Sequence, residues 1–206
     1  MRNFQALVLS GVLVLTMTAT AGAAAAAPDP LQEEIEQVLA KTQGGAQISR
    51  HEIAWDGGAV IMSFPLPGET QAPVSTAAAQ RLQAKVTGRH VGTAEPLRVS
   101  GGVSAQADDK CPTEVFGNDW YCFYQNADFG GRRLQWNATH KSPVYFSKYD
   151  FDNRTSSWSN KGGKKIYVYE DFWVDNPTKL WTESAHSRDS YVGYNVDNRA
   201  DYFVTS

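Results

Sequence analysis

Two short segments rich in oxygen donors are the part of this sequence best suited to binding chemistry. The first, 152–157, reads Asp-Asn-Arg-Thr-Ser-Ser, and the second, 197–202, reads Asp-Asn-Arg-Ala-Asp-Tyr. Carboxylate, amide, hydroxyl and backbone carbonyl oxygens together supply the ligands that a hard cation takes from a flexible loop. The alternative is an Asx-type turn, in which the Asp and Asn side chains only satisfy the nearby backbone. Both interpretations place these segments in loops.

Catalytic chemistry has little support in the sequence. Residues 111–206 contain only two histidines, His140 and His186, and no His-Glu-x-x-His or Gly-x-Ser-x-Gly motif surrounds them. A pair of carboxylates could act on glycosides, but the Asp residues of this half stand in turn contexts, where a structural role is typical. The sequence therefore predicts a protein that is not an enzyme.

The N-terminus has the features of a secretory signal peptide over residues 1–27. Arg2 precedes an apolar run at 6–17, and a tract of small residues with Ala-x-Ala triplets follows at 19–27. The apolar run is shorter than the roughly 20 residues that a membrane-spanning helix needs. We therefore expect cleavage near Ala27 and a secreted, extracellular protein with no membrane association afterwards.

The two cysteines, Cys111 and Cys122, fit this expectation, because structural disulfides persist in oxidising compartments. We predict that they pair. Two cysteines without a nearby group of histidines do not complete a tetrahedral zinc site.

Composition divides the rest of the chain into two unlike parts. Of the 24 Phe, Trp and Tyr residues, 21 lie at 111–206, so only this part can build a large aromatic core. The same part holds 11 Lys and Arg against 12 Asp and Glu. A protein that binds nucleic acid needs a clustered basic excess, and the nearest candidate, 161–165, reads as a Gly-containing turn with solvated lysines. The sequence thus predicts no nucleic-acid partner.

Residues 28–110 are predicted to be an N-terminal region, a pro-region or a linker. Apolar residues at helical spacing over 31–41, with Asp29 as N-cap, predict a short amphipathic helix. Two β-prone runs, 47–55 and 59–64, flank an Asp-Gly turn and predict a hairpin. The stretch 65–110 has too little apolar content to bury a core of its own.

The aromatic half is a tandem repeat in an ungapped register of 45 residues. Tyr124, Trp136 and Tyr149 fall on identical residues at 169, 181 and 194, and the triplet 152–154 falls on 197–199. A unit of about 45 residues is too small to bury a stable core alone, so the two copies should pack face to face.

Within each copy the local signals predict four strands separated by Gly, Asn and Asp turns. Eight strands in two such copies predict an all-β sandwich of two Greek keys. The strands are expected at 121–125, 132–136, 144–148 and around 157 in copy one, and at 166–170, 178–181, 191–194 and around 203 in copy two.

These residues resemble the βγ-crystallin family. Tyr124, followed seven positions later by Gly131, is similar to the folded first hairpin of its Greek key, where the aromatic ring covers a glycine at φ > 0. In copy two, Asn176 stands at the position of this glycine, and Pro177 follows it. Segment 152–157 resembles in full the calcium motif of microbial members, and 197–202 lacks its final serine. The resemblance implies asymmetric calcium binding, with candidate ligands Asp152, Asn153, Arg154 and Ser156, then Asp197, Asn198, Arg199 and Asp201.

The whole layout is similar to that of the streptomycete metalloproteinase inhibitors, small secreted proteins with this fold. The similarity covers 111–206 and includes Cys-Pro-Thr at 111–113 and Trp-Tyr-Cys-Phe-Tyr at 120–124. The family has two disulfides, and this chain can form one. The resemblance implies a monomeric secreted inhibitor whose partner is an extracellular metallopeptidase. Two alternatives are a calcium-binding βγ-crystallin of the envelope or of stress responses without inhibitory activity, and an extracellular carbohydrate-binding module.

Overall fold

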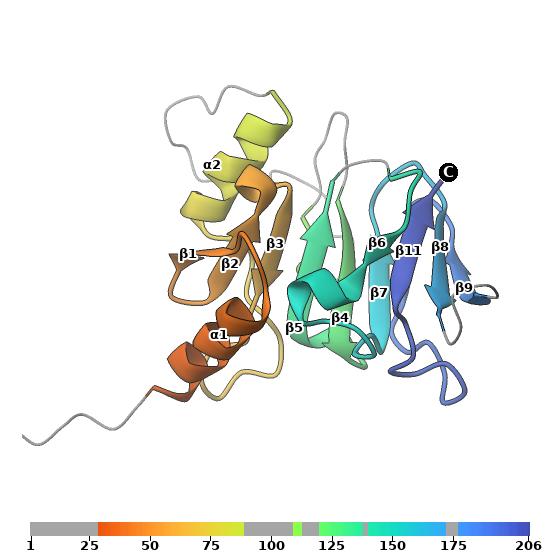
Figure 1. Cartoon of the computed structure of the whole chain (residues 1–206), viewed down its shortest axis with the longest axis horizontal. Coiled ribbons are helices and arrows are strands. Elements are labelled where there is room, and N and C mark those ends of the chain that lie inside the picture. Colours follow the sequence, from red (N-terminus) through yellow and green to blue (C-terminus); the bar gives the residue numbers. More distant parts are fainter. Residues whose placement is uncertain (1–28, 89–108, 113–119, 138–139, 172–176) are drawn as a thin grey trace, which may run out of the picture.

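The computed structural model describes residues 29–88, 109–112, 120–137, 140–171 and 177–206 (Figure 1). The predicted signal peptide lies outside these residues. None of the described helices is long and apolar enough to cross a membrane. The elements are α1 (Pro30–Lys41), β1 (Ala46–Ser49), β2 (Glu52–Trp55), the 3-10 turn η1 (Asp56–Gly58), β3 (Val60–Ser63), α2 (Ala77–Val86), β4 (Tyr121–Asn126), β5 (Gly130–Trp136), β6 (Val144–Tyr145), the 3-10 turn η2 (Phe146–Tyr149), β7 (Ser157–Asn160), β8 (Ile166–Glu170), β9 (Thr178–Glu183), β10 (Ser187–Asp189) and β11 (Tyr202–Thr205).

Strands β4–β11 form two interlocked Greek keys, as the repeat predicts. The large sheet has the order β1-β2-β3-β5-β4-β7-β10, and the small sheet has the order β6-β11-β8-β9, with antiparallel pairing throughout. Copy one gives its third strand, β6, to the small sheet, where it pairs with β11. Copy two gives its third strand, β10, to the large sheet, where it pairs with β7. This reciprocal exchange confirms the predicted all-β, βγ-crystallin-like fold.

The third strand of each copy differs from its predicted bounds. In copy one the strand ends at Tyr145, and η2 continues to Tyr149, beyond which Asp150 adopts a left-handed conformation at φ 51. In copy two the predicted strand at 191–194 is wrong, because Gly193 has φ 94 and the residues that pair with β7 lie earlier, at Ser187–Asp189. Residues 191–194 form part of a loop.

The N-terminal segment, which we define as residues 29–88, extends the large sheet. The predicted helix and its Asp29 cap are present, and Asp29 accepts a hydrogen bond from the Leu31 amide at 3.1 Å. The predicted hairpin is β2–β3, although its first run is divided into two strands, β1 and β2. Strand β3 then pairs with β5 of copy one over four residue pairs, from Val60↔Trp136 to Ser63↔Arg133. Figure 1 shows the segment beside this edge.

Helix α2 lies within residues 65–110, which the sequence predicts to be a linker or pro-region without regular structure. For 77–86 this prediction is wrong. Thr76 caps the helix and also donates its hydroxyl to the buried carboxylate of Glu52, which accepts the Thr76 amide as well, at 3.0 Å. Ala79 is buried beside Ile61. A helix that packs mainly through small side chains buries little apolar surface, so its composition resembles that of a linker.

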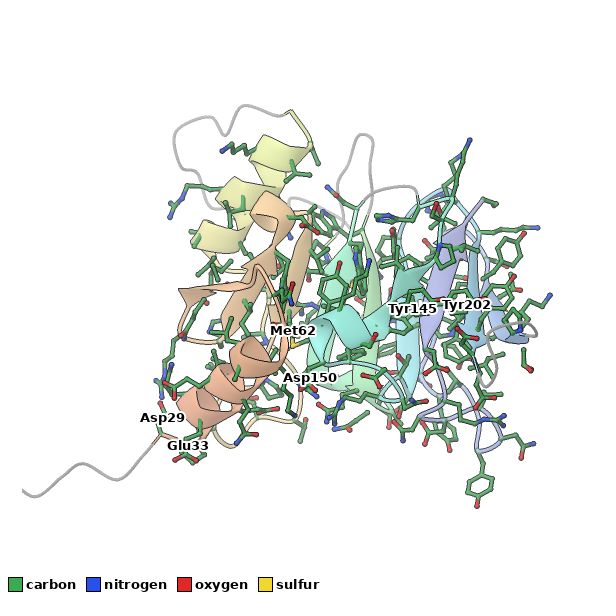
Figure 2. The ribbon with its side chains drawn as sticks, in the orientation of Figure 1. Asp29, Glu33, Met62, Tyr145, Asp150 and Tyr202 are labelled. Carbon is green, nitrogen blue, oxygen red and sulfur yellow. A yellow bond between two sulfur atoms is a disulfide. The ribbon has the colours of Figure 1, made fainter. Side chains whose placement is uncertain are left out.

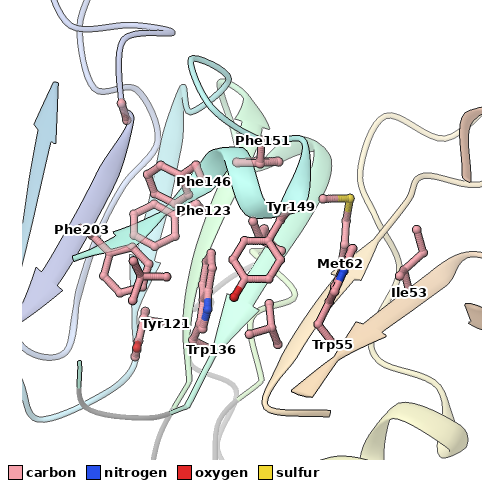
Figure 3. Close-up of a cluster of buried hydrophobic side chains, with 14 of the residues drawn as sticks. Ile53, Trp55, Met62, Tyr121, Phe123, Trp136, Phe146, Tyr149, Phe151 and Phe203 are labelled. Atoms are coloured by element: carbon pink, nitrogen blue, oxygen red, sulfur yellow. The ribbon is translucent and has the colours of Figure 1, made fainter. Parts of the chain in front are cut away.

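One hydrophobic core runs through both parts of the molecule. Trp136 packs edge to face on Phe203 at 4.9 Å and on Tyr149 at 5.4 Å between ring centroids. Tyr149 in turn contacts Trp55 of the N-terminal segment at 5.3 Å. Figure 3 shows this succession from the aromatic residues between the sheets to Trp55 and Met62. The N-terminal segment is therefore packed against the Greek keys as part of the same core.

Glu183, the last residue of β9, is fully buried, and burial raises the pKa of its carboxyl well above the ordinary value. The hydrogen bond from Trp181 at 3.2 Å opposes this shift. A carboxyl with a raised pKa in the folded state stabilises the fold below its unfolded pKa of about 4.3, and this contribution is lost as the pH rises through the folded pKa. We expect Glu183→Gln to raise the melting temperature at pH 8 by about 3 °C or more and to leave it unchanged near pH 4. Equal shifts at both pH values in thermal denaturation would contradict this.

Candidate functional site

The two Asp-Asn-Arg loops meet at one end of the sandwich and form hydrogen bonds with each other. The Asn153 amide donates to the Ala200 carbonyl at 2.9 Å, and the Asn198 amide donates to the Thr155 carbonyl at 3.2 Å. Both asparagines are left-handed, with φ of 55 and 56, a conformation that Asn tolerates better than most residues. The 45-residue register relates these two bonds, so the loops form a paired structure about a local pseudo-twofold axis.

Each loop is also anchored to the first strand of its own copy. The Ser156 amide donates to the Tyr124 carbonyl at 3.0 Å, and the Asp201 amide donates to the Tyr169 carbonyl at 2.9 Å. The Ser156 hydroxyl adds a bond to the Gln125 carbonyl at 3.0 Å. Serine at this position therefore has a structural role, and because its hydroxyl donates this bond, the lone pairs of its oxygen can still accept or coordinate.

A polar pocket lies where the loops meet the β4–β5 hairpin. Five of the predicted cation ligands line it together: Asn153, Arg154, Ser156, Asp197 and Asn198. Four further lining residues are Gln125, Asn126, Ala127 and Tyr191. The sequence analysis missed these four, although three of them directly follow Tyr124, the tyrosine of the folded first hairpin.

Asp197 is the residue that most clearly suits a cation in this pocket. Its Oδ1 atom is buried and has no hydrogen-bond partner among the described residues. A buried carboxylate oxygen without a donor is costly, and a bound cation would satisfy it. The Arg154 guanidinium forms an ion pair with Asp150 at 3.8 Å.

The other three predicted ligands are not among the residues that line this pocket. Arg199 forms an ion pair with Glu170 at 2.5 Å, and Asp201 accepts hydrogen bonds from the Asp171 amide at 2.7 Å and from Asn153 Nδ2 at 3.1 Å. Asp152, the third, is half-buried. The structure thus brings the two loops together asymmetrically. Across the described part of the chain, no three His, Cys, Asp or Glu side chains gather as a metal-binding group, so amide, hydroxyl and carbonyl oxygens would supply most ligands.

The glycine of the folded first hairpin in copy one has the predicted positive φ. Gly131 has φ 70, and a Cβ there would lie 2.8 Å from Cβ of Gln125, so a larger residue does not fit. The Tyr124 ring is buried and packs on Phe129 at 5.4 Å. Asn176, the counterpart of Gly131 in copy two, lies outside the described residues.

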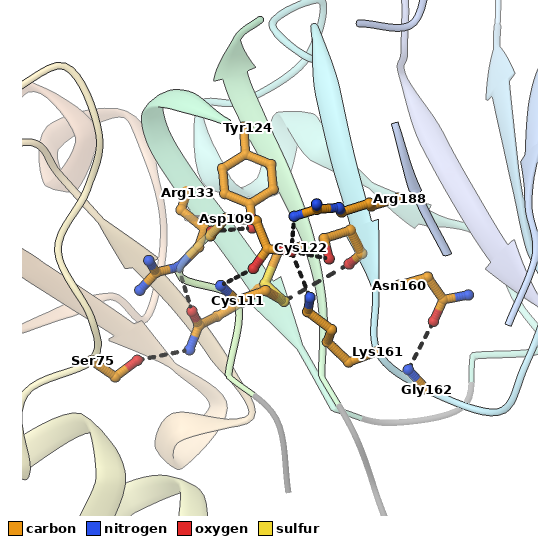
Figure 4. Close-up of a disulfide and its surroundings, with 12 residues drawn as sticks. Ser75, Asp109, Cys111, Cys122, Tyr124, Arg133, Asn160, Lys161, Gly162 and Arg188 are labelled. Atoms are coloured by element: carbon orange, nitrogen blue, oxygen red, sulfur yellow. Dashed lines mark hydrogen bonds and ion pairs between the residues drawn. A yellow bond between two sulfur atoms is a disulfide. The ribbon is translucent and has the colours of Figure 1, made fainter. Parts of the chain in front are cut away.

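The predicted disulfide between Cys111 and Cys122 is present, with a Cα–Cα distance of 5.9 Å (Figure 4). Asp109 lies beside it and is 2% exposed. Its carboxylate accepts from the Cys111 amide at 3.0 Å and from Lys161 Nζ at 2.5 Å. Sequence reasoning missed Asp109, because it stands at the end of the low-complexity stretch.

Aromatic side chains also occupy the outer face of the small sheet. Tyr202 stacks on Tyr169 at 5.0 Å and contacts Tyr145 at 5.1 Å between ring centroids. Figure 2 shows Tyr145 and Tyr202 side by side on adjacent strands. Tyr202, which contacts both other rings, is 7% exposed, so little of its ring surface is open to solvent. This arrangement is less suited to stacking on a sugar than an open ring face would be.

Comparison with known proteins gives one family match. Residues 104–178, less than half of the chain, match the model of peptidase inhibitor family I36. The match spans copy one, the disulfide and the start of copy two. This is the family that the resemblance indicated, and the predicted relationship to peptidase inhibitors is confirmed. No curated protein matches the chain.

Solved βγ-crystallin domains resemble part of the structure. A domain from Clostridium beijerinckii is 19% identical with a TM-score of 0.33, covering 41% of this chain and 94% of its own. A βγ-crystallin from Ciona intestinalis is also 19% identical, with a TM-score of 0.32, covering 42% of this chain and 99% of its own. These scores are low, and the fold assignment rests on the strand pairing and its internal symmetry.

Proposed function

We propose that this chain, whose residues 104–178 carry the features of peptidase inhibitor family I36, is a secreted proteinaceous inhibitor of metallopeptidases. The family match carries the proposal. Three features support it: a signal-like N-terminus, a disulfide of the kind found in exported proteins, and a compact core that holds surface loops in fixed positions. Rigid loops favour inhibitory binding because less conformational entropy is lost on association.

The test is inhibition of purified zinc endopeptidases by the full chain, expressed in a secreting host and recovered from the medium. A thermolysin-like enzyme is the first target, and serine and cysteine peptidases are the controls. We expect stoichiometric inhibition of at least one metallopeptidase and none of the controls. Retention in the cells would contradict secretion, and no inhibition at micromolar protein would contradict the inhibitor function.

We further propose that the polar pocket between the two Asp-Asn-Arg loops binds a single calcium ion. The unpartnered Oδ1 of Asp197 supports this, and so do the nearby amide, hydroxyl and carbonyl oxygens of Asn153, Ser156 and Gln125. One site is expected, because the Arg199–Glu170 ion pair already engages the related residues of copy two.

Millimolar calcium should therefore raise the melting temperature of the protein by several degrees, since a ligand at about 100 times its Kd adds about 2.7 kcal/mol. Asp197→Asn should abolish this rise, and Asp152→Asn should preserve it, because Asp152 does not line the pocket. Calorimetric titration should give a stoichiometry of one. A loss of the calcium response in Asp152→Asn with retention in Asp197→Asn would contradict the assignment.

A further inference from the structure

Tyr194, in the loop between β10 and β11, is the most exposed large hydrophobic residue described, at 89%. Its counterpart in the repeat, Tyr149, is only 7% exposed. Trp136 and Trp55 pack against the Tyr149 ring, and Trp55 comes from the N-terminal segment (Figure 3). The N-terminal segment thus covers the tyrosine of copy one, and none of the described residues covers that of copy two.

The loop that carries Tyr194 is held at both ends. On one side, the Ser190 carbonyl accepts from the Asp128 amide at 2.8 Å, and the Val192 amide donates to the Ser156 carbonyl at 2.9 Å. On the other side, the Asp197 amide donates to the Gly193 carbonyl at 3.0 Å. These bonds fix the backbone around an aromatic residue that is 89% exposed among the described residues.

The Arg199 side chain adds a further support to the same loop. Its Nη1 atom donates to the Asn195 carbonyl at 2.6 Å, while its Nε and Nη2 atoms bond the Glu170 carboxylate. Glu170 is a buried residue of β8, so it ties the residue after Tyr194 to the small sheet. The tip of the loop is therefore fixed before any partner binds.

We propose that Tyr194 is the main anchor by which this protein contacts its target peptidase, with the ring entering an apolar pocket of the peptidase's substrate cleft. The inference rests on the proposed inhibitor function. Tyrosine is enriched among the residues that dominate interface energies, because it buries a large ring at little entropic cost. A loop already held in place loses little further freedom on binding. Three other large apolar residues of the described chain are exposed. Val74 and Val86 are smaller and lie in the N-terminal segment, and Tyr191, in the same loop as Tyr194, is 42% exposed.

The experiment compares inhibition constants of the full chain and three variants against the metallopeptidase that the unaltered chain inhibits. Tyr194→Ser should raise the inhibition constant about thirtyfold or more, the loss typical of a dominant interface residue. Tyr194→Phe should stay within about threefold, because the ring supplies the contact. Val74→Ser, an exposed apolar residue elsewhere, should change nothing. All variants should melt like the unaltered chain, since the Tyr194 side chain supports no packing.

The outcomes separate the two proposals. If the unaltered chain inhibits and Tyr194→Ser inhibits equally well, the anchor role is wrong and the inhibitor function stands. If the unaltered chain inhibits no metallopeptidase, both proposals fail together. A Tyr194→Ser variant that melts much lower than the others would show a structural role for the ring and would also overturn the anchor.

Discussion

Removal of residues 1–88 is expected to destabilise the Greek-key domain by about 3 kcal/mol or more, enough to leave it unfolded or loosely packed at 37 °C. The deletion removes β3 from the edge of β5 and exposes Trp136 and Tyr149, which now pack against Trp55, Val60 and Met62. Exposed apolar surface of this kind costs roughly 25 cal/mol per Å².

Arg133 makes the expected loss larger. It is completely buried, and its guanidinium donates to the Pro73 carbonyl at 2.9 Å and to the Ser63 hydroxyl at 3.1 Å. Both acceptors belong to the N-terminal segment, so the deletion leaves a cation beside an apolar core with one remaining side-chain partner, Gln135 at 2.9 Å. Burial lowers the pKa of the Arg133 guanidinium.

Circular dichroism and thermal melting of residues 89–206 should therefore show a melting temperature far below that of residues 28–206. Addition of a separate 29–88 fragment should restore part of the loss, because β3 and α1 bind through noncovalent contacts. These contacts include the ion pairs of Lys41 with Asp150 at 3.4 Å and of Glu34 with Arg132 at 3.6 Å, and Figure 2 places Asp150 next to α1. A truncated domain that melts within about 2 °C of the longer chain would refute the dependence.

The same contacts bear on the fate of residues 28–110, which the sequence left between a pro-region and a spacer. A spacer would make few contacts with the domain, whereas residues 29–88 contribute three strands to its sheet and Trp55 to its core. Proteolysis between the two parts would yield a noncovalent complex in place of a free domain. Analysis of the secreted protein would test whether this cleavage occurs.

The Greek keys could be predicted because their signals are local and repeated. Tyr124 and Gly131 fix one folded hairpin, and the 45-residue register fixes the relation between the copies. The pairing of β3 with β5 has no such signal. Residues 60–63 and 133–136 are far apart in sequence, and an apolar strand carries no mark of which sheet edge it will join. The sequence therefore predicted the hairpin β2–β3 and not its position.

The sequence predicted the two loops of the candidate site but not the other residues that line the pocket. A motif names the residues of one loop, but the pocket arises because two loops related by 45 residues exchange hydrogen bonds across a pseudo-twofold axis. The sequence also could not show that Arg199 bonds Glu170, since 29 residues separate them. Asp109 illustrates the same limit, because its partners come from three distant parts of the chain.

Asp109→Ala is expected to destabilise the protein by about 3–5 kcal/mol, the usual effect of breaking a buried ion pair by removing one partner. Lys161 Nζ lies 2.5 Å from the Asp109 carboxylate, and Arg188 Nη1 lies 3.7 Å from it. Without the carboxylate, the Lys161 ammonium, whose side chain is 14% exposed, and the Arg188 guanidinium both lose this ion-pair partner. The Ser159 hydroxyl and the Cys111 amide lose their acceptor as well.

Thermal denaturation should show the loss as a fall in melting temperature of at least about 6 °C. Glu69→Ala, which removes an exposed carboxylate, is the matched control and should shift the melting temperature by less than 1–2 °C, roughly the effect of an ordinary surface substitution. The double variant Asp109→Ala with Lys161→Met should recover part of the loss, because it removes the unpaired cation. If the double variant melts no higher than Asp109→Ala, the uncompensated charge is not the cause. The loss would then have to come from Ser159 and the Cys111 amide, whose bonds to Asp109 hold the disulfide loop against β7.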